Sequence, residues 1–236
     1  YISIYLPVPT GNVAITDLGP TLSDDSIVTG IFNEQLTVEK SGNKVIDLKN
    51  KDTHFSRIYV FSHDSQNGKP VGEELALSDL AGGTKIDITN AAISHARSEA
   101  GNLPRLQSDQ KIYFRLRVSF NNQEFVPFVN KIAPSDRFFL SGYRSEECVD
   151  FRVNEARNLP ITVQRRITAD SEAYELPITR VDFLLAVGTR ASLAEGAQIF
   201  HKFRLLEPEI WDNYITQELE ELPSDGMCIY HCRKLT

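Results

Sequence analysis

The clearest pattern of apolar and polar positions lies between Lys111 and Phe120. Apolar side chains occupy every second position, and the positions between them are mostly polar. This period of two is typical of a β-strand with one buried face. Residues 121–123 are turn formers, and a second apolar run follows at 125–132, so the pattern predicts a β-hairpin. The residues expected to face the core are Ile112, Phe114, Leu116, Val118 and Phe120.

Short runs of the same kind recur along the chain. They are rich in β-branched and aromatic residues and are separated by turn residues. The first run meets Pro7 and Pro9, and because proline cannot donate to a sheet ladder, we expect these residues at a sheet edge or at the end of a strand. Residues 41–43, Ser-Gly-Asn, predict a hairpin turn. The predicted strands are 1–8, 27–32, 35–39, 44–48, 57–62, 137–140, 148–153, a buried strand at 180–187, and 227–235.

Three segments favour short helices. Thr89 or Asn90 can cap a helix that runs to Ala100 and ends at Gly101. This helix is expected to pack through its apolar positions 92, 93 and 96. Further helices are expected at 191–199 and at 207–222, where apolar residues recur at helical spacing. Residues 63–83 are polar and contain several glycines, which predicts a long surface loop.

These elements predict a mainly β protein. Four candidate strands between residues 27 and 62 leave no room for the crossovers that a parallel sheet needs. We therefore expect an antiparallel β-sandwich, jelly-roll or immunoglobulin-like, with two or three short helices. The sequence changes only slightly in character near 158–166, which is at most a weak boundary. The expectation is one β-rich domain over residues 1–236, with helical decoration in its C-terminal third.

Composition narrows the classes of function. The net charge of −7 argues against a protein whose main role is to bind phosphate backbones, because that role needs Lys and Arg. No run approaches the roughly 18 apolar residues of a membrane helix, so we expect a soluble protein without a membrane span. The three cysteines and the absence of Asn-x-Ser/Thr sites favour a reducing intracellular environment or an assembled particle. The strand-like start at Tyr1 predicts a processed product or a piece of a longer chain.

One cluster contains the residue types of a metal site. Cys228, His231 and Cys232 lie close together in sequence, and Cys148 and His201 lie elsewhere in the chain. On a strand, however, Cys228 and Cys232 share one face while His231 points to the other. Buried thiols on a β-strand are the favoured explanation of the cysteines, because free cysteines usually lie in such places. We therefore predict no bound metal and no cofactor, and whether these three residues bind metal is a question for the structure.

No motif in the sequence identifies a catalytic residue. Ser62-His63-Asp64 has the residue types of a triad, but triads assemble from positions that are distant in sequence. Cys148 follows two glutamates, which disfavour a thiolate nucleophile. Gly82-Gly83-Thr84-Lys85 lacks the spacing of a phosphate-binding loop and predicts a glycine turn. The acidic residues at 24–25 and 218–221 fit solvated surfaces better than a calcium loop.

A basic and aromatic surface is the main candidate for binding nucleic acid. Tyr113, Arg115 and Arg117 fall on the outer face of the predicted hairpin. Arg137, Arg144 and the basic residues at 164–166 can extend this face. A charged outer face also has an ordinary explanation, since it contacts water and discourages aggregation between sheet edges. Nucleic acid is therefore a possible partner but not the favoured one.

Three classes of function follow. The favoured one is a non-catalytic structural or binding protein that assembles with itself or with other proteins, as coat or shell subunits of a virion or capsid do. Exposed edge strands such as residues 1–8 suit this role. The first alternative is a β-sandwich domain that binds nucleic acid or has a regulatory role. The second is an enzyme whose site is assembled from scattered residues such as His54, His63 and His201.

Overall fold

The computed structural model describes residues 1–42, 44–61, 73–121, 128–132, 146–151, 159–169, 178–191, 193, 200, 202–207 and 226–235. Two compact units share the chain. Unit 1 comprises Tyr1–Pro20 and Val38–Ala173, and unit 2 comprises Thr21–Thr37 and Tyr174–Thr236. The single domain and the weak boundary near 158–166 stay predictions, and the last passage of the chain from unit 1 to unit 2 falls slightly later, after Ala173.

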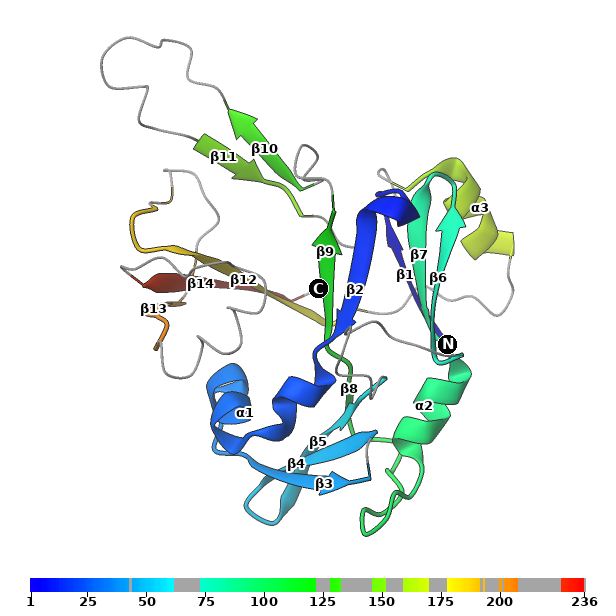
Figure 1. The fold of residues 1–236 in the computed structure, drawn as a ribbon, viewed down its shortest axis with the longest axis vertical. Coiled ribbons are helices and arrows are strands. Elements are labelled where there is room, and N and C mark those ends of the chain that lie inside the picture. Colours follow the sequence, from blue (N-terminus) through cyan, green and yellow to red (C-terminus); the bar gives the residue numbers. More distant parts are fainter. Residues whose placement is uncertain are drawn as a thin grey trace. The chain divides into compact units, whose positions relative to one another are not determined.

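The first sheet of unit 1 is antiparallel and has the strand order β1-β7-β6 (Figure 1). Its strands are β1 (Ile2–Leu6), β6 (Leu75–Leu80) and β7 (Gly83–Ile88). The predicted position at a sheet edge or at the end of a strand is therefore confirmed. The long loop expected at 63–83 is wrong for its last part, because Leu75–Leu80 is a strand. Ala81 and Gly82 make the turn to β7 with φ angles of 51° and 79°.

The predicted hairpin at 111–132 is wrong in its pairing but right in its alternation. The run is divided between β8 (Ile112–Tyr113), which pairs in parallel with β5 (Thr53–Tyr59), and β9 (Leu116–Phe120), which pairs with β2 (Val13–Asp17). The second run forms β10 (Val129–Ile132), whose partner is β11 (Glu146–Val149). All five residues expected to face inward do pack against the core.

A four-stranded sheet with the order β3-β4-β5-β8 completes unit 1. Its strands besides β8 are β3 (Thr37–Ser41), β4 (Val45–Asn50) and β5 (Thr53–Tyr59). β3 and β4 are neighbours, as the predicted hairpin at 41–43 requires, and Gly42 has a φ of 61° at this turn. Only glycine adopts this backbone region at little cost.

The helices differ from expectation more than the strands do. α2 (Asn90–Arg97) is confirmed, with Thr89 as its N-cap, although it ends before Gly101, and Ala92 and Ala96 are fully buried. Residues 27–32 are not a strand but part of α1 (Asp25–Phe32), whose cap is Asp24. α3 (Ile161–Ala169) was not expected. Two 3₁₀ turns are Thr10–Asn12 (η1) and Gly19–Ser23 (η2). The expected strand at 137–140 and the helix at 207–222 lie outside the described residues, as does nearly all of 191–199.

One apolar core joins the sheets of unit 1. Its buried members come from β2, β4, β5, β6, β7 and α2, together with the segments next to them. Partly buried residues of β1, β8 and β9 pack against it. They are Ile2 and Leu6, Ile112, and Leu116, Val118 and Phe120. The strands β1, β2 and β4 to β9 and the helix α2 therefore all contribute side chains to the same core.

Unit 2 contains α1 and an antiparallel sheet with the order β12-β14-β13. Its strands are β12 (Arg180–Gly188), β13 (Lys202–Leu205) and β14 (Met227–Leu235). β12 and β14 match the predicted strands. The expected burial of β12 is wrong, because its residues are half-buried or exposed and Leu184 is 55% exposed.

The described chain is thus a mainly β protein built from small, mostly antiparallel sheets and three α-helices. No helix within the described ranges is long and apolar enough to cross a membrane.

Candidate functional site

The outer edge of β1 is the most unusual surface in unit 1. β7 pairs with one side of β1 from Ile2 to Leu6, and no other described strand pairs with it. The strand has the sequence Ile-Ser-Ile-Tyr-Leu. Among the described edge strands longer than two residues, β1 alone contains no Lys, Arg, Asp or Glu. Natural proteins usually protect such an edge with charged side chains, so an uncharged edge is an open template for another strand.

A row of three apolar side chains, exposed at its two ends, crosses this sheet at its middle. Ile4 of β1 and Leu77 of β6 are both cross-strand partners of Ile86 in β7. Ile86 is almost fully buried, whereas Ile4 is 42% and Leu77 36% exposed. Cross-strand partners share a face. The face that carries the core therefore stays partly open to solvent at both edges of the sheet.

The position of β1 on β7 is closely defined. Gly83 begins β7, and a Cβ atom at this position would meet the backbone oxygen of Leu6 and the ring of Tyr5. Next to it, the Thr84 hydroxyl donates to the carbonyl oxygen of Val8 at 2.7 Å. The absence of a side chain at position 83 therefore lets the end of β1 approach β7 closely.

A polar cluster centred on Asp182 lies on one face of the unit 2 sheet. Its carboxylate accepts from Arg233 Nε at 2.7 Å, and His231 Nε2 lies at the same distance. Arg180 Nε lies 2.7 Å from the second oxygen. Partial burial acts to raise the pKa of Asp182, but these hydrogen bonds and the two guanidinium charges outweigh it, so the pKa lies below its usual value.

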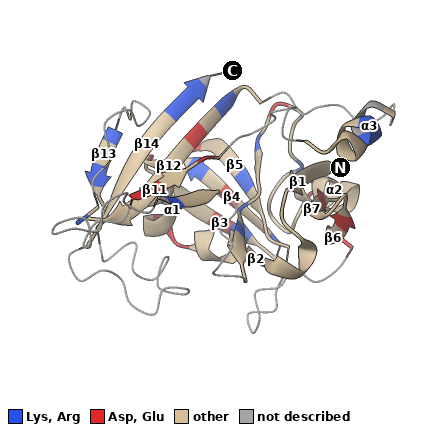
Figure 2. Ribbon diagram, turned by 90° about the horizontal axis from the view of Figure 1, so that it is seen from above, with Lys and Arg blue, Asp and Glu red and all other residues tan. Residues whose placement is uncertain are grey.

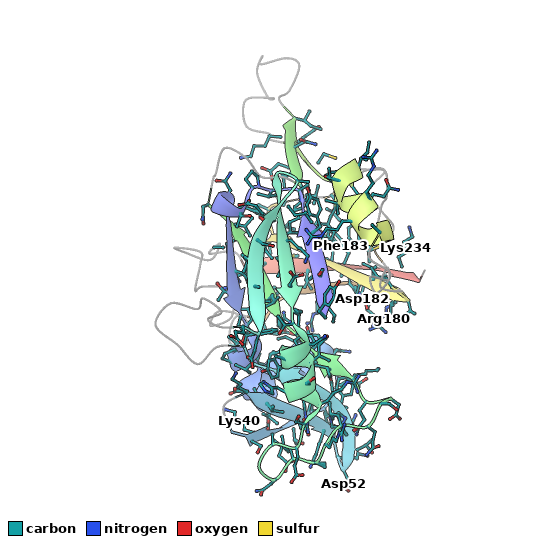
Figure 3. All side chains as sticks on the ribbon, turned by 90° about the vertical axis from the view of Figure 1, so that its right-hand side faces the viewer. Lys40, Asp52, Arg180, Asp182, Phe183 and Lys234 are labelled. Atoms are coloured by element: carbon teal, nitrogen blue, oxygen red, sulfur yellow. The ribbon has the colours of Figure 1, made fainter. Side chains whose placement is uncertain are left out.

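The cysteines of this sheet lie on the opposite face from the Asp182 cluster. Cys228 pairs with Val187 and Cys232 with Phe183, whereas His231 pairs with Leu184. Figure 3 shows the same separation, with Arg180 and Asp182 on one side of the strands and Phe183 and Lys234 on the other. The three cysteines form no disulfide. In the part of the chain that the structure describes, no group of three His, Cys, Asp or Glu side chains can hold a metal ion.

A second cluster in unit 1 surrounds Glu74. Lys44 Nζ donates to its two carboxylate oxygens at 2.9 and 2.8 Å. His95 Nδ1 lies 2.7 Å from the first of these oxygens. Partial burial acts to raise the pKa of Glu74. The hydrogen bonds from Lys44, Tyr59 and His95 outweigh this effect, so the pKa lies below its usual value. Burial, followed by the hydrogen bond to Glu74, raises the pKa of the Tyr59 hydroxyl.

Arg57 and Asp47 form a buried ion pair beneath α2. Arg57 is fully buried, and its guanidinium contacts both Asp47 oxygens, at 2.5 and 2.8 Å. It also donates to the carbonyl oxygens of Ala96, Ser98 and Pro104. His54 lies 3.8 Å from Asp47, and burial lowers the pKa of its imidazole. This network ties β4 and β5 to the chain around α2 and is structural in character.

The sequence did not reveal these clusters because their members are far apart in the chain. Glu74 and His95 are 21 positions apart, and Asp182 and His231 are 49 apart. No local spacing marks them, although the alternation along 180–187 and 227–235 did assign Asp182 and His231 to strands.

The structure describes only some of the residues of the predicted basic surface. Tyr113 and Arg115 lie close, with Arg115 Nη1 donating to the Tyr113 hydroxyl at 3.0 Å. Residues 164–166 lie on α3 and are exposed. Arg137 and Arg144 fall outside the described residues, as do His63, His201 and the stretch 62–64. Gly82 lies in a turn, as expected.

Comparisons with known proteins give no relative for this chain, because no family model, no curated protein and no solved structure matches it.

Proposed function

We propose that this protein is a non-catalytic structural protein whose copies assemble with one another, as coat or shell subunits do. The β1 edge carries the proposal. It is an uncharged strand at a sheet edge, and it contains Ile4, which is 42% exposed although it lies on the core-facing side. Adding a strand here would pair the backbone groups that no described strand pairs and would cover Ile4 in one step.

A second copy of the same strand fits this edge well. Antiparallel pairing about a two-fold axis at Ile4 would place Ile2 opposite Leu6 and bring the two Ile4 side chains together. Such an interface is isologous, so each copy uses the same residues. Because β1 contains no charged residue, the pairing creates no like-charge contact. Pairing with β6 instead would bring Asp79 into the interface.

The acid–base groups support a role without catalysis. Glu74 is engaged by Lys44, Tyr59 and His95, and Asp182 by two arginines and His231. A carboxylate whose pKa is lowered by such partners is a weak general base. These clusters therefore fit positions that hold strands together.

We also propose that unit 1 is a β-sandwich of jelly-roll or immunoglobulin-like type. In support, the β1-β7-β6 sheet and the β2–β9 pair contribute side chains to one core. Assembly through an edge strand would extend one layer of such a sandwich without disturbing its interior.

Light scattering on two variants tests the assembly. Ile4→Lys places a charge on the β1 edge, and Leu77→Lys places one at the matching position of the other edge of the same sheet. We expect the mass of the natural chain to rise with concentration to a discrete oligomer. Ile4→Lys should remain a monomer up to at least tenfold higher concentration, and Leu77→Lys should assemble like the natural chain.

Three outcomes would count against the proposal. A strict monomer at all concentrations rules out self-assembly. The hypothesis to test is then that another protein binds to β1. Equal effects of both variants would show that charge anywhere on the sheet matters more than the β1 edge. Loss of assembly by Leu77→Lys alone would move the interface to β6.

A further inference from the structure

The Asp182 side of the unit 2 sheet is strongly basic. The strand register places Arg180 of β12, Arg233 of β14, and Lys202 and Arg204 of β13 on this side. Asp182 is the one acidic residue that the described strands place there. We call this surface the basic face. Figure 2 shows Lys and Arg on all three strands. This local excess of positive charge is opposite in sign to the net charge of the whole chain, which is −7.

Asp182 holds the central cations of the basic face in position. Arg180 and Arg233 each approach it through Nε, at 2.7 Å. A guanidinium has five donor hydrogens in a planar fork, so one contact through Nε leaves donors that a ligand can use. The carboxylate thus orders the two side chains in advance of binding, which lowers the entropy cost of contacting an anion.

A pocket opens beside these cations, at the β13 edge. Its volume is about 390 Å³, and its lining residues are Lys202, Phe203, Arg204, Ile229 and His231. Phe203 is 58% exposed, and its ring lies 5.0 Å from that of Tyr230. Arg204 is anchored by a hydrogen bond of 3.2 Å to the carbonyl oxygen of Gly30. Phe203 pairs with Tyr230, so its ring lies on the opposite face of the sheet from Lys202 and Arg204, and the pocket adds positive charge to the basic face.

The cations are spread over too long a path for one small anion. Arg180 lies level with Leu235 of β14, whereas Arg204 lies level with Ile229, two strands away from β12. Six residues along a strand span roughly 20 Å. An extended ligand with several phosphate groups matches this spread, whereas one phosphate contacts only one end of it.

We propose that the basic face binds single-stranded nucleic acid through its phosphates, along Arg180, Arg233 and Lys202. Proteins that bind single strands without sequence preference use a positively charged path that follows the phosphate backbone. An unpaired strand is flexible enough to follow this path across three strands, whereas a duplex is stiff over this length. The inference is independent of assembly through β1.

Fluorescence anisotropy of the full chain with labelled oligouridylate and oligothymidylate tests this proposal. We expect both single strands to bind more tightly than a duplex of the same length, and binding to weaken as salt rises. Lys202→Gln should reduce the slope of log affinity against log salt by about 0.7, the value of one phosphate contact on a single strand. Phe203→Ala should leave both the affinity and the slope unchanged, because the Phe203 ring lies on the opposite face of the sheet.

Lys40→Gln is the matched control. Lys40 is an exposed lysine on edge strand β3 (Figure 3) and lies on another sheet. This control should bind like the natural chain. The proposal is wrong if no single strand binds at low salt, if duplex binds more tightly, or if Lys40→Gln weakens binding as much as Lys202→Gln does. Thermal unfolding of each variant separates loss of binding from loss of fold.

Discussion

At the scale of single residues, the ionisable groups of unit 1 hold elements together. Arg57 illustrates this most clearly, since all its described partners are Asp47 and backbone carbonyl oxygens. Breaking a buried pair of this kind leaves an uncompensated charge and is strongly destabilising. The Glu74 cluster is similar but lies nearer the surface, so pH can titrate it.

Glu74→Gln tests the role of this carboxylate in stability. The pKa of Glu74 is lowered in the folded protein, so its stabilising effect is present above the ordinary carboxyl pKa and is lost as pH falls through the folded value. The variant should lose about 1–3 kcal/mol of unfolding free energy near neutral pH. The difference from the natural chain should shrink between about pH 5 and pH 3, because protonated Glu then resembles Gln.

Chemical denaturation across this pH range measures the effect. Glu99→Gln serves as the control, because Glu99 is an exposed glutamate. A constant difference between Glu74→Gln and the natural chain at all pH values would contradict the assignment of charge to Glu74.

The role of a single residue can be predicted from the sequence only where it follows from local spacing. It placed Cys228 and Cys232 opposite His231, and the register of β14 agrees. It missed Glu74, His95 and Arg57, because their partners come from strands and loops whose pairing depends on the whole fold. Buried charge in particular leaves no signature in the sequence, since Arg57 resembles any polar residue in an alternating strand.

At the scale of elements, the approach of β1 to β7 depends on Gly83. Gly83→Ala adds a Cβ atom that meets the Leu6 oxygen and the Tyr5 ring, so β1 must move away from β7. We expect a loss of about 1–3 kcal/mol in unfolding free energy. Gly11→Ala is the control, since a Cβ atom there has no neighbour within 4 Å. Equal stability of the two variants, measured by chemical denaturation, would show that β1 adjusts without cost.

Individual strands were more predictable than their pairing. The inward positions of 111–120 follow from alternation alone, yet β8 and β9 pair with β5 and β2, which are distant in sequence. The helix at 25–32 was mistaken for a strand because Ile27, Val28 and Thr29 are β-branched. Asp24 decided the outcome, since its carboxylate accepts from the backbone N–H groups of Ser26 and Ile27 and so begins the helix.

At the scale of the whole molecule, added salt should have opposite effects on the two proposed interactions. Copies of a chain with a net charge of −7 repel one another, so added salt should favour assembly through β1. The same salt should weaken nucleic-acid binding at the basic face. The sequence indicated net acidity and a mainly β chain. It did not reveal that four cations converge on one sheet face, because that depends on the register of three strands.

Hydrogen exchange at β1 tests the central claim most directly. The amides of Ile2–Leu6 that point away from β7 have no partner strand among the described residues and become hydrogen-bonded if β1 pairs with another β1. Mass spectrometry of a peptide covering this strand should show exchange that slows as protein concentration rises, and Ile4→Lys should abolish this slowing. Exchange at β1 that stays equally fast while the measured mass increases would contradict the account and place the interface elsewhere.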